Sequence, residues 1–153
     1  MKKGQVQINH HWARFAVVAV LSIISVLSVA QLANATGTIS KADLSGPWAM
    51  SLVGDTGCGI SSMYVTFTLS SSGTGTASIV SHTAGCGDAT TPGQTFTVQT
   101  LAANGSGTAN LTCGPGCGWN LDIQVSADRA TFSVVDVSTA NPGNFLEGVA
   151  IHQ

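Results

Sequence analysis

Four cysteines are the residues of this chain with the most distinctive chemistry. Cys113 and Cys117 flank the triplet Gly-Pro-Gly, whereas Cys58 and Cys86 stand singly in separate Gly-rich stretches. Such cysteines can form disulfides, bind zinc or exchange thiols, and their spacing favours one of these roles. Zinc sites usually contain two close cysteine pairs, and redox-active pairs usually have the form Cys-x-x-Cys. We therefore expect two disulfides, Cys113 with Cys117 and Cys58 with Cys86, and no metal. A zinc site is the alternative.

A pair of carboxylates could support acid–base chemistry. Asp136 has the sequence phase of the apolar residues that precede it. Glu147 has the phase of three apolar neighbours, Phe145, Val149 and Ile151. Two carboxylates that face each other in an interior tend to share a proton, which is the arrangement of many hydrolases. The favoured interpretation is instead a bulge at residues 134–135 that turns Asp136 outward. We therefore expect no catalytic residues.

Strand signals dominate the elements that must position these residues. The stretches MYVTFTLS, TFTVQT and WNLDIQVS alternate apolar and polar residues with a period of two. Turn clusters rich in Gly, Ser, Asn and Pro separate the alternating stretches. The pattern predicts eight strands, at residues 48–53, 63–71, 76–82, 95–102, 108–113, 119–126, 130–137 and 145–151. The expected interior mixes large and small residues: Trp48, Phe67, Phe96, Phe132, Ala77, Ala109 and Ala130.

Several connections are short enough for hairpins, so neighbouring strands should pair in a meander. Eight antiparallel strands in sequence, with no helix to cover an edge, are best closed on themselves. We therefore predict an all-β fold, an eight-stranded antiparallel up-and-down barrel. A β-sandwich is the alternative, because the spacing of strands does not show closure.

Connections in a meander alternate between the two ends of a barrel. The first, third, fifth and seventh connections therefore share one end, where all four cysteines are expected; we call it the cysteine end. Three polar residues near these connections are the candidate ligand-binding residues: Asp55, His82 and Asp88. The longest connections belong to the same end, at residues 54–62, 83–94 and 138–144. A binding surface is therefore expected there, because loops on a rigid scaffold commonly carry function.

The lead into the first expected strand, LSGPWAM, contains Gly46-Pro47-Trp48. Together with the eight-strand meander, this Gly-x-Trp motif resembles the opening of the calycin barrels, the lipocalin and avidin group. The resemblance implies a barrel that binds a small ligand and a Trp that plugs one end. None of the ligand residues of avidin is recognised in this sequence, so no ligand site is carried over.

The first 35 residues have the three parts of a secretory signal. Basic residues precede an apolar run at residues 15–30, and Ala33-Asn34-Ala35 forms a cleavage motif. The alternative, a membrane anchor, is disfavoured because the run is shorter than the roughly 20 residues of a spanning helix. We expect a signal peptide at 1–35, a lead-in at 36–44, a barrel domain at 45–153 and a secreted or periplasmic protein.

The charge of the expected mature chain restricts its partners. Residues 36–153 contain two basic and seven acidic residues, which gives a formal charge of −5. Nucleic acid and anionic membrane surfaces are therefore disfavoured as partners, because both are bound through basic side chains. No cofactor motif is recognised, and we expect no cofactor.

These observations favour a secreted, disulfide-stapled binding module that acts without catalysis through the cysteine end. Its partner would be a small molecule, a glycan or a protein. A structural surface or matrix protein without a small ligand is the alternative. A secreted hydrolase that uses Asp136 and Glu147 is the least favoured hypothesis.

Overall fold

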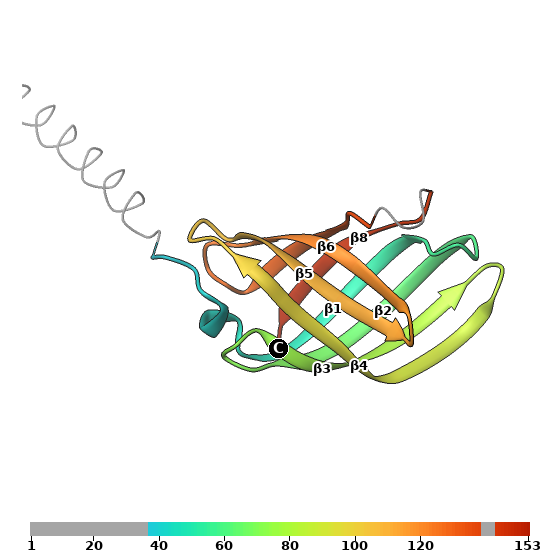
Figure 1. Cartoon of the computed structure of the whole chain (residues 1–153), viewed down its shortest axis with the longest axis horizontal. Coiled ribbons are helices and arrows are strands. Elements are labelled where there is room, and N and C mark those ends of the chain that lie inside the picture. Colours follow the sequence, from blue (N-terminus) through green and yellow to red (C-terminus); the bar gives the residue numbers. More distant parts are fainter. Residues whose placement is uncertain (1–36, 139–142) are drawn as a thin grey trace, which may run out of the picture. The chain divides into compact units, whose positions relative to one another are not determined.

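The computed structural model describes residues 37–138 and 143–153. In this part of the chain, eight antiparallel strands form one closed barrel in sequence order, and β1 pairs with β8 (Figure 1). The strands are β1 Gly46–Asp55, β2 Ile60–Leu69, β3 Thr74–Thr83, β4 Gly87–Leu101, β5 Ser106–Gly114, β6 Cys117–Val125, β7 Thr131–Asp136 and β8 Phe145–His152. The predicted up-and-down barrel is confirmed, and the sandwich is excluded. The expected signal peptide and residues 139–142 lie outside the described residues.

Two connections that the sequence predicts to be long are short turns. The expected loops 54–62 and 83–94 shrink to residues 56–59 and 84–86, because the flanking strands continue into them. β4 passes through Pro92 and Gly93, where the register with β3 shifts opposite Ser78. A bulge of this kind accommodates a proline, which cannot donate a ladder hydrogen bond. The Gly/Pro cluster therefore belongs to a strand, although its composition is typical of a loop.

Aromatic side chains fill the barrel interior. The rings of Phe67 and Phe96 stack with centroids 4.5 Å apart, and those of Trp48 and Phe132 lie 4.8 Å apart. The expected large interior residues are all buried, and so are the small residues Ala77 and Ala109. The expectation that Ala130 lies in the interior is wrong, because this residue is exposed in the turn before β7. Large and small residues alternate across the interior, because an eight-stranded barrel has little more room than its side chains need.

The inward face of β8 is the opposite of the predicted one. Phe145, Val149 and Ile151 are 50%, 48% and 53% exposed, whereas Leu146 and Ala150 are buried. Both faces of the sequence FLEGVAI are apolar, so its alternation does not decide which face is inside. Packing decides it, because Ala150 lies in register with Phe132 and places a small side chain beside a large one.

The bulge expected at residues 134–135 is absent. β6 and β7 pair without a register shift from Val125 with Phe132 to Leu121 with Asp136. Val134 is buried, and Val135 is 51% exposed, so Asp136 keeps the inward phase of the strand. The carboxylate needs no bulge because it ends β7, where its Oδ1 accepts a hydrogen bond from Ser138 N at 2.8 Å.

The lead-in closes the end of the barrel opposite the cysteines. A short 3-10 helix, η1 Lys41–Leu44, places Leu44 in the interior, and Trp48 Nε1 donates a hydrogen bond to Leu44 O at 2.8 Å. Hydrogen bonds from the side chain and backbone of Ser40 lower the pKa of Asp43 below its usual range. No helix in residues 37–138 and 143–153 is long and apolar enough to span a membrane.

Two phenylalanines on opposite faces of the barrel wall provide a test of this packing. Phe132→Ala should lower the free energy of unfolding by roughly 3–5 kcal/mol, because it leaves a cavity among buried aromatic rings. Phe145→Ala removes the same atoms from an outward position and should cost less than about 1 kcal/mol. Urea denaturation of both variants measures the difference. Similar losses would contradict the assigned faces of β7 and β8.

Candidate functional site

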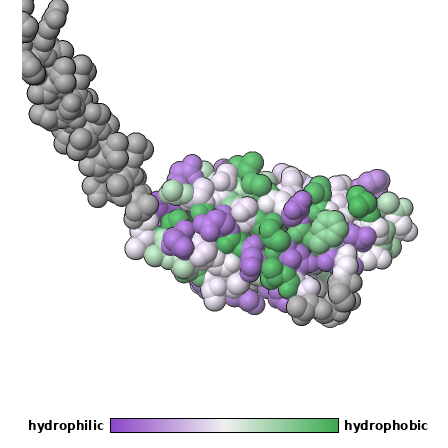
Figure 2. Space-filling view, turned by 90° about the horizontal axis from the view of Figure 1, so that it is seen from above, coloured by the Kyte–Doolittle hydropathy of each residue, from purple (hydrophilic) through white to green (hydrophobic). Residues whose placement is uncertain are grey.

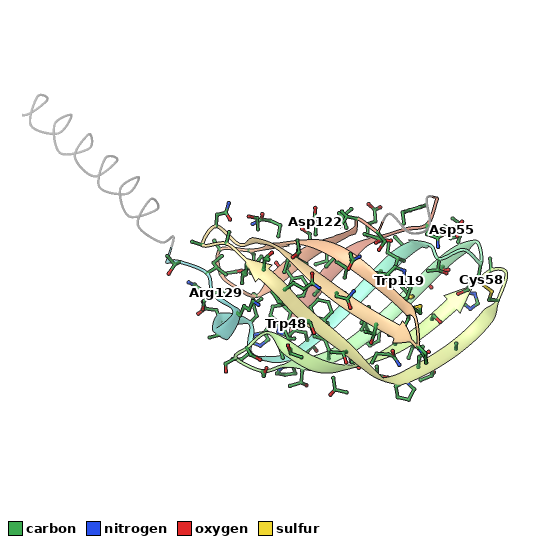
Figure 3. All side chains as sticks on the ribbon, in the orientation of Figure 1. Trp48, Asp55, Cys58, Trp119, Asp122 and Arg129 are labelled. Atoms are coloured by element: carbon green, nitrogen blue, oxygen red, sulfur yellow. A yellow bond between two sulfur atoms is a disulfide. The ribbon has the colours of Figure 1, made fainter. Side chains whose placement is uncertain are left out.

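Both disulfides expected from the sequence are present, and both lie at the cysteine end. Cys58–Cys86 joins the β1–β2 turn to the β3–β4 turn with Cα atoms 5.6 Å apart. Cys113–Cys117 spans the β5–β6 turn with Cα atoms 5.1 Å apart. Cys58 and Trp48 mark the two opposite ends of the barrel in Figure 3. Two disulfides and no free cysteine among the described residues indicate an oxidising compartment.

The turns that hold Cys58 and Cys86 are also joined by backbone contacts. Gly85 N donates to Cys58 O at 2.8 Å, and Ala84 N donates to Ile60 O at 3.0 Å. A Cβ atom at Gly85 would lie 2.4 Å from Cys58 O, so only glycine permits this approach. Two cross-linked hairpins at the cysteine end therefore take the place of the long loops that the sequence suggested at 54–62 and 83–94.

The side chains of His82 and Asp88 contact each other on the outer wall of the barrel near this end, and they form an ion pair when His82 is protonated. They are direct partners in the β3–β4 register, and His82 Nδ1 contacts Asp88 Oδ1. Their side chains are 75% and 77% exposed. An exposed pair of this kind contributes little to stability, typically about 0–1 kcal/mol. Both side chains therefore remain accessible to a ligand on the wall, outside the mouth of the barrel.

A shallow hollow in the outer wall includes this ion pair. It has a volume of about 640 Å³ and lies across β1, β2, β3 and β4. Its outward-facing lining consists of Ser51, Val53, Ser62, Tyr64, Val80, His82, Asp88 and Thr90. Tyr64 is 49% exposed and lies in register with Val80. We call this feature the Tyr64 hollow.

Sequence reasoning missed Tyr64 as a member of the site. Its signal was present, because the alternation in MYVTFTLS puts Met63 and Val65 inside and leaves the aromatic ring of Tyr64 outside. Its proximity to His82 could not be predicted, since it depends on the register that pairs Ser62 with His82.

Asp55 does not join the pair formed by His82 and Asp88. It ends β1, where it lies in register with Ile60 and Phe145, and its Oδ1 accepts a hydrogen bond from Gly57 N at 2.8 Å. This contact shapes the β1–β2 turn. Asp55 does not line the Tyr64 hollow, so the structure brings together two of the three candidate ligand-binding residues.

The two carboxylates of the hydrolase hypothesis point to opposite sides of the wall. Asp136 faces the interior, whereas Glu147 is exposed on the outer face, in register with Val53 and Val135. The expectation that Glu147 shares the core phase is therefore wrong, for the same reason that applies to the rest of β8. Separated by the wall, these two side chains do not form an acid–base pair.

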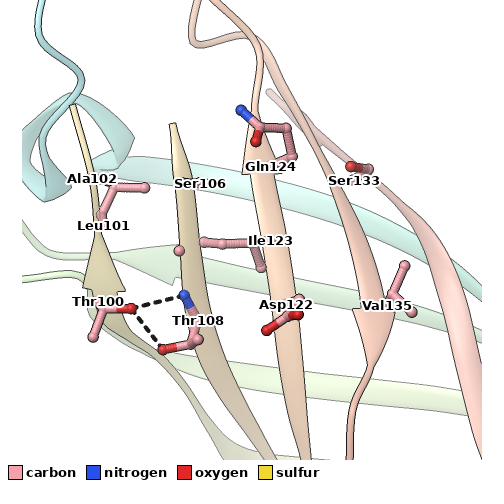
Figure 4. A pocket seen from close by; sticks show the side chains of 11 residues that line it. Thr100, Leu101, Ala102, Ser106, Thr108, Asp122, Ile123, Gln124, Ser133 and Val135 are labelled. Carbon is pink, nitrogen blue, oxygen red and sulfur yellow. Dashed lines mark hydrogen bonds between the residues drawn. The ribbon is translucent and has the colours of Figure 1, made fainter. Parts of the chain in front are cut away.

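A second hollow lies on the wall formed by β4 to β7 (Figure 4). Several of its polar groups already have partners: Thr100 Oγ1 lies 2.8 Å from Thr108 Oγ1 and accepts a hydrogen bond from Thr108 N at 3.1 Å. Gln124 Nε2 donates to Asn104 O and Val125 O. No aromatic residue lines this hollow. It therefore offers a ligand less than the Tyr64 hollow does.

Two further observations bear on the identity of the site. In residues 37–138 and 143–153, no three His, Cys, Asp or Glu side chains gather closely enough to hold a metal ion. Comparison with protein-family models and with curated proteins finds no match for this chain. The function is therefore inferred from the geometry alone.

The two disulfides should differ in their contribution to stability. In the chain-entropy model the gain depends on the length of the closed loop, and the separations are 28 and 4 residues. Replacing Cys58 and Cys86 by Ser should lower the free energy of unfolding by roughly 3–4 kcal/mol, against about 2 kcal/mol for Cys113 and Cys117. Denaturant titration of the two double variants tests this order, and a reversed order would refute it.

Proposed function

We propose that this protein is an extracellular, non-catalytic binding module that recognises hydroxyl-rich ligands, namely glycans, at the Tyr64 hollow. The observation that carries the proposal is the placement of a half-exposed aromatic ring beside an accessible ion pair. Tyr64 and Val80 lie in one cross-strand row, and Ser62, His82 and Asp88 lie in the next outward row. A few polar groups around an apolar surface are typical of small-ligand sites.

The chemistry of the hollow suits a sugar. A sugar ring has an apolar C–H face and a rim of hydroxyl groups, each of which both donates and accepts hydrogen bonds. The Tyr64 ring supplies a flat apolar surface, the carboxylate of Asp88 accepts hydrogen bonds, and Ser62 both donates and accepts. The volume of about 640 Å³ falls within the roughly 300–1,000 Å³ of ordinary ligand sites.

The charge of the chain further narrows the ligand class. Residues 36–153 carry a formal charge of −5, and no Lys or Arg lines the Tyr64 hollow. An acidic polysaccharide would be repelled by the net negative charge, because no Lys or Arg in the hollow compensates its carboxylates or sulfates. The preferred ligands are therefore neutral glycans.

The hollow is rigid before a ligand binds. Its residues lie on four paired strands, and Cys58–Cys86 cross-links the turns at one edge. Rigid positioning lowers the entropy cost of ordering side chains on binding. This favours recognition by a preformed surface over a loop that folds around its ligand.

A panel of immobilised neutral and acidic polysaccharides tests the proposal. The protein should be retained by at least one neutral polysaccharide, and Tyr64→Ala or Asp88→Asn should weaken that binding at least about tenfold. Thr108→Ala, in the hollow of Figure 4, is the matched control and should bind normally. Failure to retain any neutral polysaccharide, or loss of binding only in the Thr108 variant, would falsify the glycan site.

A second candidate function, assembly into a surface or matrix structure, is favoured by the apolar outer wall. Five apolar side chains on β1, β7 and β8 are about half exposed: Val53, Val135, Phe145, Val149 and Ile151. Apolar residues also lie among polar ones on the face shown in Figure 2. Extensive exposed apolar surface on a small domain commonly marks a contact with another protein.

Sedimentation of the wild-type protein distinguishes this candidate. An assembly subunit should sediment as a dimer or larger species, and Val149→Glu should return it to a monomer, because a charge would be buried in the contact. Thr97→Glu, on the far side of the barrel, is the control. A wild-type protein that stays monomeric at every concentration tested excludes assembly through this wall.

A further inference from the structure

One side-chain oxygen of Asp136 receives no hydrogen bond from residues 37–138 and 143–153. Oδ1 accepts the bond from Ser138 N, but Oδ2 is buried, and no donor within the described part of the chain reaches it. A buried carboxylate oxygen without a donor is unfavourable, because the water it bonded in the unfolded chain is not replaced. Such groups are uncommon in folded proteins and commonly indicate a missing ion, water or ligand.

An aromatic residue shares the inward face with this carboxylate. Asp136 lies in register with Leu121, and Trp119 lies two residues further along β6 towards the cysteine end. Trp119 is partly buried and packs against the core. Figure 3 shows it in the half of the barrel away from Trp48. A carboxylate and an indole on the same inward face, two residues apart along the ladder, are a suitable setting for a cation, which is attracted by the charge and by the face of the ring.

No basic side chain of residues 37–153 supplies that cation. Lys41 and Arg129 are the only Lys and Arg residues in this range, and both lie at the opposite end of the barrel. Lys41 Nζ donates to Gln99 O at 2.8 Å, and Arg129 Nε lies 3.6 Å from Asp43 Oδ1. His82 contacts Asp88 on the outer wall. A cation at this carboxylate would therefore come from another molecule.

We propose that Asp136 and Trp119 form an inward binding site for a small organic cation of the ammonium class. The N–H groups of a protonated amine would supply the donor that Oδ2 lacks, and the alkyl groups would rest on the indole. This site is separated from the Tyr64 hollow by the barrel wall, so it does not depend on the proposed glycan function.

Methylammonium and tetramethylammonium chloride serve as probes, and Trp119 serves as the reporter. Residues 36–153 contain two tryptophans, Trp48 and Trp119, so an ¹H–¹⁵N spectrum of this segment resolves their indole N–H signals. Added methylammonium should shift the Trp119 signal saturably and leave Trp48 unchanged. Sodium chloride at equal ionic strength and neutral tert-butanol should not produce the shift. Tetramethylammonium, which has no N–H group, should bind more weakly than methylammonium. The absence of a saturable shift with methylammonium overturns the proposal.

Asp136→Asn replaces the oxygen that lacks a donor and removes its charge. The remaining amide oxygen can still accept the hydrogen bond from Ser138 N. This variant should weaken methylammonium binding at least about tenfold, because the amide carries no charge to attract the cation. Glu147→Gln makes the same chemical change on the outer face and should leave binding unchanged. Equal binding by wild type and Asp136→Asn, or equal losses in the two variants, would show that Asp136 is not the acceptor.

Discussion

Eight residue pairs, from Trp48 with His152 to Asp55 with Phe145, join β1 to β8 and close the sheet into a barrel. Closure fixes the volume available to inward side chains, so a large residue requires a small one beside it. Ala77 lies in register with Phe67, and Ala150 lies in register with Phe132, in agreement with this constraint. Aromatic rings fill the interior towards the end that the lead-in covers, so the outer wall and the cysteine end are the surfaces that remain open to solvent.

The up-and-down order of the strands puts the tight turns that cover the core at one end of the barrel and the accessible polar side chains at the other. Even-numbered connections form tight turns at one end, such as Gly73 N to Ser70 O and Gly105 N to Ala102 O, beside the lead-in that covers the core. Odd-numbered connections carry the disulfides at the other end. Cross-linked hairpins can extend beyond the core there without losing their shape, and the accessible ion pair of His82 and Asp88 lies on one of them.

The sequence allowed the fold to be predicted where one face of a strand is apolar. In β2, Met63 and Val65 alternate with polar or exposed residues, and the predicted inward face is correct. In β8 both faces are apolar, so only packing against Phe132 decides the orientation. The site was harder to predict, because the contact between His82 and Asp88 depends on the register between β3 and β4. The inward phase of Asp136 depends on an unbroken β7.

The first part of β4 has a neighbour on one side only. β4 pairs with β3 from Gly87 onward, but its ladder with β5 begins only at Phe96. Where the two ladders meet, Thr95 N donates a hydrogen bond to the side-chain Oγ1 of Thr112 in place of a backbone oxygen. A free strand edge invites pairing with another chain and is a common starting point for aggregation. Pro92, which lacks an N–H group, and the bulge beside it interrupt that edge, which makes it a poor template for pairing with another strand.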